Sequence, residues 1–564
     1  MSVSHTYSVG RGSTAESETL RNTGHDEGVR VLQPRARAMV IANATVLVAA
    51  LLSVGQVRYE LDQGATLSQR DSGIGFTEPT PSASRPPAAQ PGRPGARPSV
   101  GPTGPGTQVP GGTGTTGPGG GSGGSGGAVG APAQPLVTVP DFGLRTQGVT
   151  PTSVLIGADY DKTGCGGAGA LASQFGAAVT GDPEKAFAAF VRHVNETGGI
   201  RGRTLKFVSV DDGGLYCPER HQAAALELVD QKKVFLDIAG LHEVSDLLAP
   251  RRLPFYGGRA TIAEQNKQGD GQFQLYQDAD GDFANWAAFG RNYLGSKTNT
   301  PCLIHPDTPD FNNLEKVLKR ALAKQGLAFK TTIAYADDPS TAQQQATTAA
   351  IKMKGDGCKQ VWLIANNFLA DVFFTNAADQ QRWYPTWTWT ARTGGIDFAL
   401  AGNLMNQNQW KNAVGLTTRI KPGQSPLDGQ CARIYNKYYG GDGQSGSAAV
   451  TVACHSILTT TEAMKRAIDR TGVLTGNSLM LGVDAIRGDF AWEAFVPLTY
   501  SVPAPGKARD RTGYDLQTVA TWNTDKRDYD FPQYPKYWRV LGPGGAGAVD
   551  IRPSFKNTYA PPKK

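Results

Sequence analysis

The chain has 564 residues and a formal net charge of +7, from 56 Lys and Arg residues against 49 Asp and Glu residues. The basic residues are scattered and do not interleave with aromatic residues, which argues against a nucleic-acid groove and indicates a solvated, mildly basic surface. The cysteines form no Cys-x-x-Cys pair, and no histidine stands at zinc-ligand spacing. We therefore expect neither a metal site nor a cofactor.

The N-terminal part predicts a tail followed by a membrane segment. Residues 1–37 are polar and nearly charge-balanced, which is typical of a disordered tail. Residues 38–57 carry no charge over a length that can cross a bilayer as a helix. Arginines cluster before this run and acidic residues appear just after it, so the tail is placed in the cytoplasm and the remainder outside. We favour an uncleaved anchor over a signal peptide with a long N-terminal region.

Residues 58–140 predict a disordered linker that holds the rest of the chain away from the membrane. From Thr77 the linker is first Pro-rich, which favours extended polyproline II, and then Gly-rich, which favours a flexible coil. We expect it to act as a spacer without catalytic content.

From Thr152 short apolar runs alternate with amphipathic helices. One such helix has a single apolar stripe, with Pro183 in its first turn and Gly198-Gly199 at its end. A second helix is predicted over 217–233 and a third over 311–326. Buried strands are predicted at 153–160, 204–212, 234–240, 302–307, 331–337, 361–366 and 385–391.

This alternation restarts near residue 301 and predicts an α/β fold with two lobes. Each lobe is expected to be a parallel sheet flanked by helices. Because ligands bind beyond the carboxyl ends of parallel strands, the site is expected in the cleft between the lobes. The predicted lobes are 150–280 with 415–490, and 281–414 with the C-terminal part, followed by a tail over 541–564.

All six cysteines follow the linker. An even number in one globular region favours disulfides formed outside the cytoplasm. Six cysteines allow about 15 connectivities, and pairing in chain order keeps each bridge local. The candidates are Cys165, Cys217, Cys302, Cys358, Cys431 and Cys454.

The segment VNETGGIRGRTLKFVSVDDG (194–213) resembles a recurring stretch of the branched-chain amino-acid-binding proteins, which are type I periplasmic solute-binding proteins of ABC transporters. Segments 234–258 and 303–326 resemble further strands and helices of that family, and the likeness spans roughly residues 150–420. The resemblance implies a two-lobed, periplasmic-binding-protein-like type I fold without enzymatic activity. It also implies an interlobe cleft that binds an amino acid, an amide or a related small polar metabolite. The implied partner is an ABC transporter permease or a membrane receptor.

The resemblance further implies which residues face the ligand. They follow the strands of both lobes, and one aromatic residue begins a helix across the cleft. The chain departs from the family at Cys165 in the first loop, at His242-Glu243, and at Phe311, which lacks the family's usual hydroxyl. The ligand-binding candidates are Leu241, His242, Glu243, Gly258, Arg259, Ala260, Thr261, Phe311, Asn366, Asn367, Thr390 and Arg392.

Several features allow two interpretations. Trp383, Tyr384, Trp387 and Trp389 either stack on a ring-bearing ligand or seal the core of a lobe. His242 is either a ligand contact or a solvated loop residue. At the level of function, the alternative to solute uptake is an anchored extracellular sensor or partner-binding scaffold. A hydrolase of cell-surface material is a remote alternative, because no nucleophile elbow, zinc helix or phosphate loop is present in the sequence.

Overall fold

The structure is a computed structural model. It describes residues 137–160, 181–213, 218–240, 242–257, 261, 263, 269–336, 338, 340–365, 369–393, 395–493, 495–500, 511–514, 516–539 and 549–550. The predicted tail, the membrane run and nearly all of the linker lie outside these residues. Within them, no helix has both the length and the apolar character needed to span a bilayer.

The first sheet is entirely parallel and has the spatial order β2-β1-β3-β4-β5. Helices α4, α5 and α6 connect successive strands, and α5 runs into a short π-helical turn, η1 (Glu227–Gln231). The strands are β1 (Ser153–Tyr160), β2 (Thr204–Asp211), β3 (Leu236–Gly240), β4 (Phe255–Gly257) and β5 (Gln272–Phe273), and the helices are α4 (Pro183–Glu196), α5 (Pro218–Leu226) and α6 (His242–Arg251).

Helix α4 forms where the sequence predicts it. The Asp182 side chain caps its first turn by accepting from the Lys185 backbone N–H at 3.2 Å, and Pro183 occupies the first position, where no N–H is needed. Its apolar stripe is buried against the sheet. Beyond the helix Gly199 has φ +62°, and a Cβ there would lie 2.2 Å from the Arg203 carbonyl oxygen. Only glycine fits this turn without displacing backbone.

The second sheet is mixed, with the order β16-β15-β13-β10-β9-β8-β6-β7 and β14 paired to β13. Strands β6 to β10 are parallel as predicted, whereas β13, β14, β15 and β16 pair antiparallel. Of these antiparallel neighbours, β13 and β14 are joined by a short hairpin, whereas β10 and β13 are separated in the chain by several helices and a strand pair. The strands are β6 (Pro301–Pro306), β7 (Thr331–Tyr335), β8 (Gln360–Leu363), β9 (Thr386–Trp389), β10 (Val414–Thr417), β13 (Leu516–Asn523), β14 (Asp528–Asp530), β15 (Lys536–Arg539) and β16 (Val549–Asp550).

Two helical layers cover the second sheet. Strand alternation in β9 sends Trp387 and Trp389 into one core, while Thr388 faces the other and accepts from the Trp286 indole N–H at 3.1 Å. Both tryptophans are buried, so they seal a core, whereas Tyr384 is exposed. The helices are α8 (Ala279–Asn292), α9 (Pro309–Lys324), α10 (Ala342–Gly355), α11 (Leu369–Gln380), α12 (Ala399–Leu404) and α13 (Gln407–Trp410).

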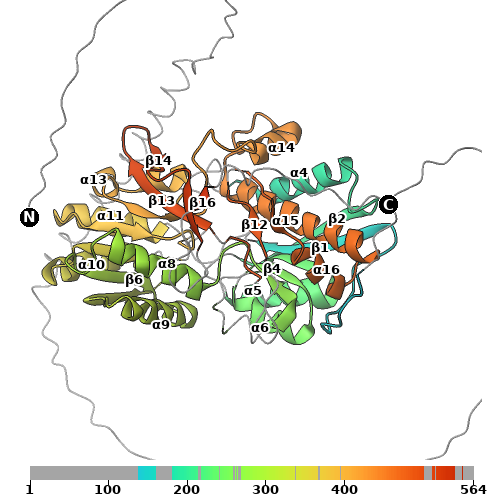
Figure 1. The fold of residues 1–564 in the computed structure, drawn as a ribbon, viewed down its shortest axis with the longest axis horizontal. Helices are drawn as coiled ribbons and strands as arrows, with labels where there is room; N and C mark the ends of the chain where they lie inside the picture. Colours follow the sequence, from blue (N-terminus) through green and yellow to red (C-terminus); the bar gives the residue numbers. More distant parts are fainter. Residues whose placement is uncertain are drawn as a thin grey trace, which may run out of the picture. The chain divides into compact units, whose positions relative to one another are not determined.

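Helices from late in the sequence complete the first lobe. Helix α15 packs beside α4 and against α16, although α4 and α15 are more than 250 residues apart in the chain (Figure 1). The residues of this group share one apolar core with the first sheet. We call the first sheet and its helices lobe 1, and the second sheet and its helices lobe 2. The late elements are α14 (Gln430–Tyr439), α15 (Ala448–Thr471), α16 (Gly476–Val483) and the strand pair β11 (Arg487–Phe490) and β12 (Leu498–Thr499).

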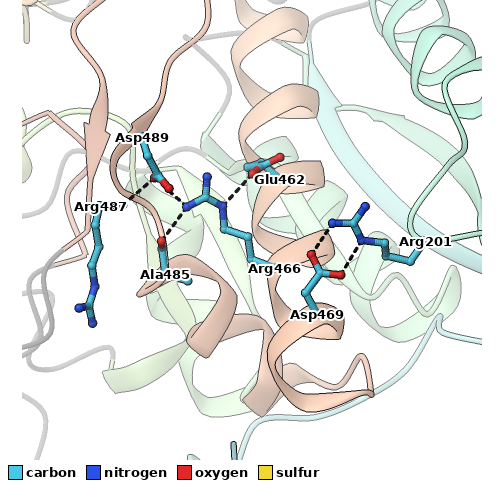
Figure 2. A network of polar contacts seen from close by, with 7 residues as sticks. All are labelled: Arg201, Glu462, Arg466, Asp469, Ala485, Arg487 and Asp489. Atoms are coloured by element: carbon cyan, nitrogen blue, oxygen red, sulfur yellow. Dashed lines mark hydrogen bonds and ion pairs between the residues drawn. The ribbon is translucent and has the colours of Figure 1, made fainter. Parts of the chain in front are cut away.

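A buried arginine ties α15 to the chain that follows α16. The Arg466 side chain is fully buried and donates to Glu462 at 2.7 Å, to Asp489 at 2.8 Å and to the Ala485 carbonyl oxygen at 2.6 Å (Figure 2). One turn further along α15, Asp469 accepts from Arg201 (Figure 2). A buried guanidinium needs such partners, because removing its charge from water is costly.

Two disulfides are described, and both follow the predicted chain order. Cys302 of β6 bonds Cys358 just before β8, and Cys431 of α14 bonds Cys454 of α15. The chain-order prediction is confirmed for these two pairs. Cys165 and Cys217 lie outside the described residues.

Replacing Cys302 and Cys358 together by serine is expected to lower the free energy of unfolding by about 4 kcal/mol. The bridge closes a loop with a sequence separation of 56, and a longer loop restricts the unfolded chain more. Replacing Cys431 and Cys454, with a separation of 23, is the comparison and is expected to cost about 3 kcal/mol. Denaturant unfolding of the oxidised proteins measures both values. Equal stability of the parent and the first variant would contradict the expectation.

Candidate functional site

The carboxyl ends of the parallel strands carry polar side chains in lobe 1. Strand β2 ends at Asp211, whose carboxylate accepts from Arg220 at 2.7 Å. The next residue, Asp212, is buried and lies 4.0 Å from the ring of buried His221. These contacts join the end of β2 to the start of α5. Asp211 Oδ1 also accepts from the Gly213 N–H at 3.0 Å, so this carboxylate stabilises the turn that follows β2.

Tyr160 ends β1 beside Asp211. Its ring stacks on Phe187 of α4, with centroids 5.6 Å apart. Burial raises the pKa of the Tyr160 hydroxyl to about 12, with a hydrogen bond to Ser209 acting in the opposite direction. The phenol therefore remains protonated at neutral pH and keeps a hydrogen to donate.

The end of β4 packs on a partly buried histidine of α15. The Tyr256 hydroxyl lies 3.3 Å from His455 Nδ1, and the His455 ring lies 5.3 Å from Trp492. Burial lowers the pKa of His455 to about 3. The imidazole is therefore neutral at physiological pH, because its charged form would lose its hydration.

The structure describes only part of the predicted ligand set. The backbone of His242 and Glu243 forms the first turn of α6, so the predicted loop after β3 is largely helical. Thr261 is buried, and Phe311 is half-buried in the first turn of α9, whose N-cap Thr308 accepts from the Phe311 N–H. Leu241, Gly258, Arg259, Ala260, Asn366 and Asn367 lie outside the described residues.

Thr390 and Arg392 follow β9, as predicted, and both have partners inside the protein. The Thr390 hydroxyl donates to Asp282 Oδ2 at 2.8 Å, and Arg392 Nη1 donates to the Gln277 carbonyl oxygen at 2.5 Å. Both residues are buried, with exposed fractions of 1% and 5%. These hydrogen bonds hold the chain after β9 against α8 and against the segment that precedes α8.

Three segments of the described chain cross between the lobes. The first is 274–278, between β5 and α8; the second is 418–429, between β10 and α14; and the third is 511–514, before β13. The first and third are bonded to each other, because the Gln274 N–H donates to the Arg511 carbonyl and the Gly513 N–H donates to the Gln274 carbonyl, both at 2.9 Å.

Sequence reasoning missed the residues that hold these crossovers. Asp282, Asp397, Thr417, Arg419 and Gln517 form buried hydrogen bonds at the crossover ends. One signal was available, since the pattern Thr-x-Arg follows two neighbouring strands, at 390–392 and 417–419. Nothing in the sequence indicates that Asp282 and Asp397 are its partners.

Other candidate sites are weaker. A surface depression of about 580 Å³ lies between α4 and β2. Its polar side chains have partners within the protein. Arg192 pairs with Glu196, and the Asn195 amide nitrogen donates to the Leu205 carbonyl oxygen while its oxygen accepts from the Leu205 N–H. Within the described residues, no group of three His, Cys, Asp or Glu side chains is arranged to hold a metal ion.

A model of the family described as "Periplasmic binding protein" matches residues 166–497, more than half of the chain. The chain belongs to this family. The match confirms the resemblance to type I periplasmic solute-binding proteins, and the two α/β lobes agree with it. No curated protein sequence matches the chain significantly.

Solved structures of periplasmic binding proteins share the fold. A branched-chain amino acid ABC transporter protein from Thermus thermophilus with bound valine has 13% identity and a TM-score of 0.53, covering 68% of this chain and 96% of its own. A fatty acid ABC transporter substrate-binding protein from Thermomonospora curvata has 15% identity and a TM-score of 0.52, covering 74% and 97%. An extracellular ligand-binding receptor from Verminephrobacter eiseniae has 14% identity and a TM-score of 0.52, covering 67% and 100%.

Acid is expected to destabilise this periplasmic binding protein domain through His455. Because the pKa of His455 is lowered in the folded state, only the unfolded chain takes up a proton as the pH first falls. The stability that the neutral imidazole contributes is therefore fully present above the unfolded pKa of about 6.5 and is lost as the pH falls toward about 3. Replacing His455 by Gln should reduce the slope of unfolding free energy against pH in this window by up to about 1.4 kcal/mol per pH unit. Urea unfolding at pH 7, 5.5 and 4.5 measures the slope.

The matched control is Tyr256→Phe, which removes the hydroxyl beside His455 and leaves the imidazole in place. This variant should keep the parental slope. An unchanged slope in His455→Gln would contradict the assignment.

Proposed function

We propose that residues 150–540 bind a small polar solute in a cleft between the two lobes, outside the cytoplasm, and pass it to an ABC-type importer without catalysing a reaction. The family match over residues 166–497 carries this proposal. The polar ends of β1 and β2 supply groups of the kind that hold such solutes. Two disulfides favour an oxidising compartment, because cytosolic thiols are kept reduced.

The proposed ligand contacts come from the loops after β3, β4 and β8 and from the start of α9. Phe311 supports this placement, because it stands in the first helical turn after β6 and its ring is half-buried rather than fully packed. The residues proposed to contact the ligand are Leu241, His242, Glu243, Gly258, Arg259, Ala260, Thr261, Phe311, Asn366 and Asn367.

A second candidate function is that of a membrane-anchored sensor or partner-binding scaffold. The uncharged run at 38–57 and the spacer at 58–140 favour it, since both keep the binding domain at the membrane surface. Uptake and sensing share the same capture step, so ligand binding is tested first.

The full chain is expected to be stabilised by one class of solute and to release that solute when denatured. A ligand present at 100 times its Kd adds about 2.7 kcal/mol to the stability of a protein that binds it only when folded. Thermal shift against amino acids, amides and fatty acids, with mass spectrometry of the denatured protein, identifies the class. Fatty acids belong in the panel because one of the similar structures is a fatty acid transporter protein. The absence of any stabilising solute would count against the proposal.

Phe311→Ala is expected to weaken binding of the identified solute by about fivefold, because an aromatic contact to a ligand contributes on the order of 1 kcal/mol. The control is Tyr384→Ala, which truncates an exposed aromatic residue on the same lobe. Isothermal titration separates the affinity from the stability of each variant. Equal affinity in the two variants would remove Phe311 from the site.

The chain is expected to remain in the membrane fraction with its N-terminus intact. The physical reason is that an uncharged run of this length is stable as a helix in hydrocarbon. Fractionation of cells, followed by N-terminal sequencing of the mature protein, measures the outcome. Recovery of a processed, soluble form would instead indicate a cleaved signal segment.

A further inference from the structure

Two neighbouring strands of lobe 2 end in the same pattern. Thr390-Ala391-Arg392 follows β9, and Thr417-Thr418-Arg419 closes β10. The strands pair in parallel, with Val414 opposite Thr388. The two Thr-x-Arg segments therefore lie side by side at the carboxyl ends of these strands, and the second leads directly into a crossover.

Each segment forms the same pair of hydrogen bonds around a buried aspartate. In the first, the Thr390 hydroxyl donates to Asp282 Oδ2 at 2.8 Å, and the Arg392 backbone N–H donates to the Thr390 hydroxyl at 3.3 Å. In the second, the Thr417 hydroxyl donates to Asp397 Oδ2 at 2.6 Å, and the Arg419 N–H donates to the Thr417 hydroxyl at 2.9 Å.

The two arginines complete the pattern by donating to backbone carbonyls. Arg392 Nη1 bonds the Gln277 oxygen of the first crossover at 2.5 Å, and Arg419 Nη1 bonds the Asp397 oxygen at 2.7 Å. Arg419 belongs to the second crossover, and its own carbonyl accepts from the Tyr537 hydroxyl at 2.9 Å.

The third crossover joins the same network. The Gln517 amide donates to Asp282 Oδ1 at 2.6 Å and accepts from Asn285 at 2.7 Å. Asp282 therefore connects the start of α8, the end of β9 and the start of β13. Both aspartates are buried, so water is not available to replace a lost donor.

We propose that these two Thr-x-Arg/Asp units are braces that fix the lobe 2 ends of the crossovers and so set the spread of lobe orientations in the ligand-free protein. Turning a crossover at lobe 2 would separate a buried carboxylate from its donors, which is strongly unfavourable. On the lobe 1 side, the crossovers are held by other contacts: the Thr499 N–H donates to the Gly513 carbonyl oxygen at 2.7 Å, and Arg511 pairs with Asp270 at 2.7 Å.

This inference goes beyond the proposed function, because it concerns the free protein and needs no ligand. It also gives Thr390 and Arg392 a positioning role in place of ligand contact.

The test measures the distance distribution between the lobes in the full chain. Nitroxide labels are attached through unnatural amino acids at exposed Lys232 in lobe 1 and Lys324 in lobe 2, which leaves the disulfides intact. Pulsed electron resonance then compares the parent with Thr390→Val, Thr417→Val and their combination. Valine keeps the shape of threonine and removes the hydroxyl. The combined variant is expected to roughly double the width of the distribution, because domain orientation is set by few hinge contacts.

The matched control is Thr460→Val. Thr460 is fully buried on α15, and its hydroxyl donates to the Ser456 carbonyl oxygen within its own helix at 2.6 Å. This variant should lose stability and keep the parental width. Serine at 390 and 417 retains the hydroxyl and should keep the parental width as well.

Folding of each variant is checked by circular dichroism. If the combined variant does not fold, the distance distributions of the two single variants are compared with the parent instead. An unchanged width in folded Thr390→Val and Thr417→Val proteins, or an equal widening in Thr460→Val, would overturn the proposal. A ligand screen without hits would leave this result untouched, so failure of the two proposals can be told apart.

Discussion

The buried carboxylate of Asp282 is the contact on which the arrangement between the lobes depends. It accepts from Thr390 at the end of β9 and from Gln517 at the start of β13, while neighbouring Arg392 holds the first crossover. Burial raises the pKa of Asp282, and the hydrogen bonds and Arg392 oppose that rise. A carboxyl group in such a place is tolerated only with several donors, so the three elements are fixed together.

Asp397 repeats this arrangement at the second crossover. Burial raises the pKa of its carboxyl group too, and Arg419 and Thr417 oppose the rise. Arg419 also lies over the Phe398 ring, 5.0 Å from its centroid, and Phe398 packs near Phe495. The second crossover is thereby in contact with aromatic residues of the chain that completes lobe 1.

The core of lobe 1 is built from segments that are far apart in the sequence. Its sheet comes from residues 153–273, while α15, which packs on α4, comes from residues 448–471. Arg466 then holds α15 to Asp489 and the Ala485 carbonyl. The chain leaves lobe 1, forms most of lobe 2, returns, and crosses a third time before β13. Lobe 1 is therefore complete only after the second crossover, and lobe 2 only after the third.

The amino-acid sequence predicts the local elements well, because strands and amphipathic helices are set by the order of apolar residues. Strand β1 falls on the predicted residues 153–160, and α4 begins at Pro183 as its proline requires. The disulfide between Cys302 and Cys358 follows from pairing in chain order. The antiparallel edge of the second sheet was not predicted, since alternating strands and helices indicate parallel pairing only.

The sequence by itself therefore determined the two α/β blocks, the family and the order of the elements. Only the tertiary structure decided what Thr390 and Arg392 contact, because their partners, Asp282 and Gln277, are more than 100 residues away. A side chain at the end of a strand faces either a ligand or a neighbouring crossover, and both choices require the same polar residue types. Which of the two the side chain contacts depends on where the first crossover and α8 lie in the folded protein, and no local sequence pattern encodes that position.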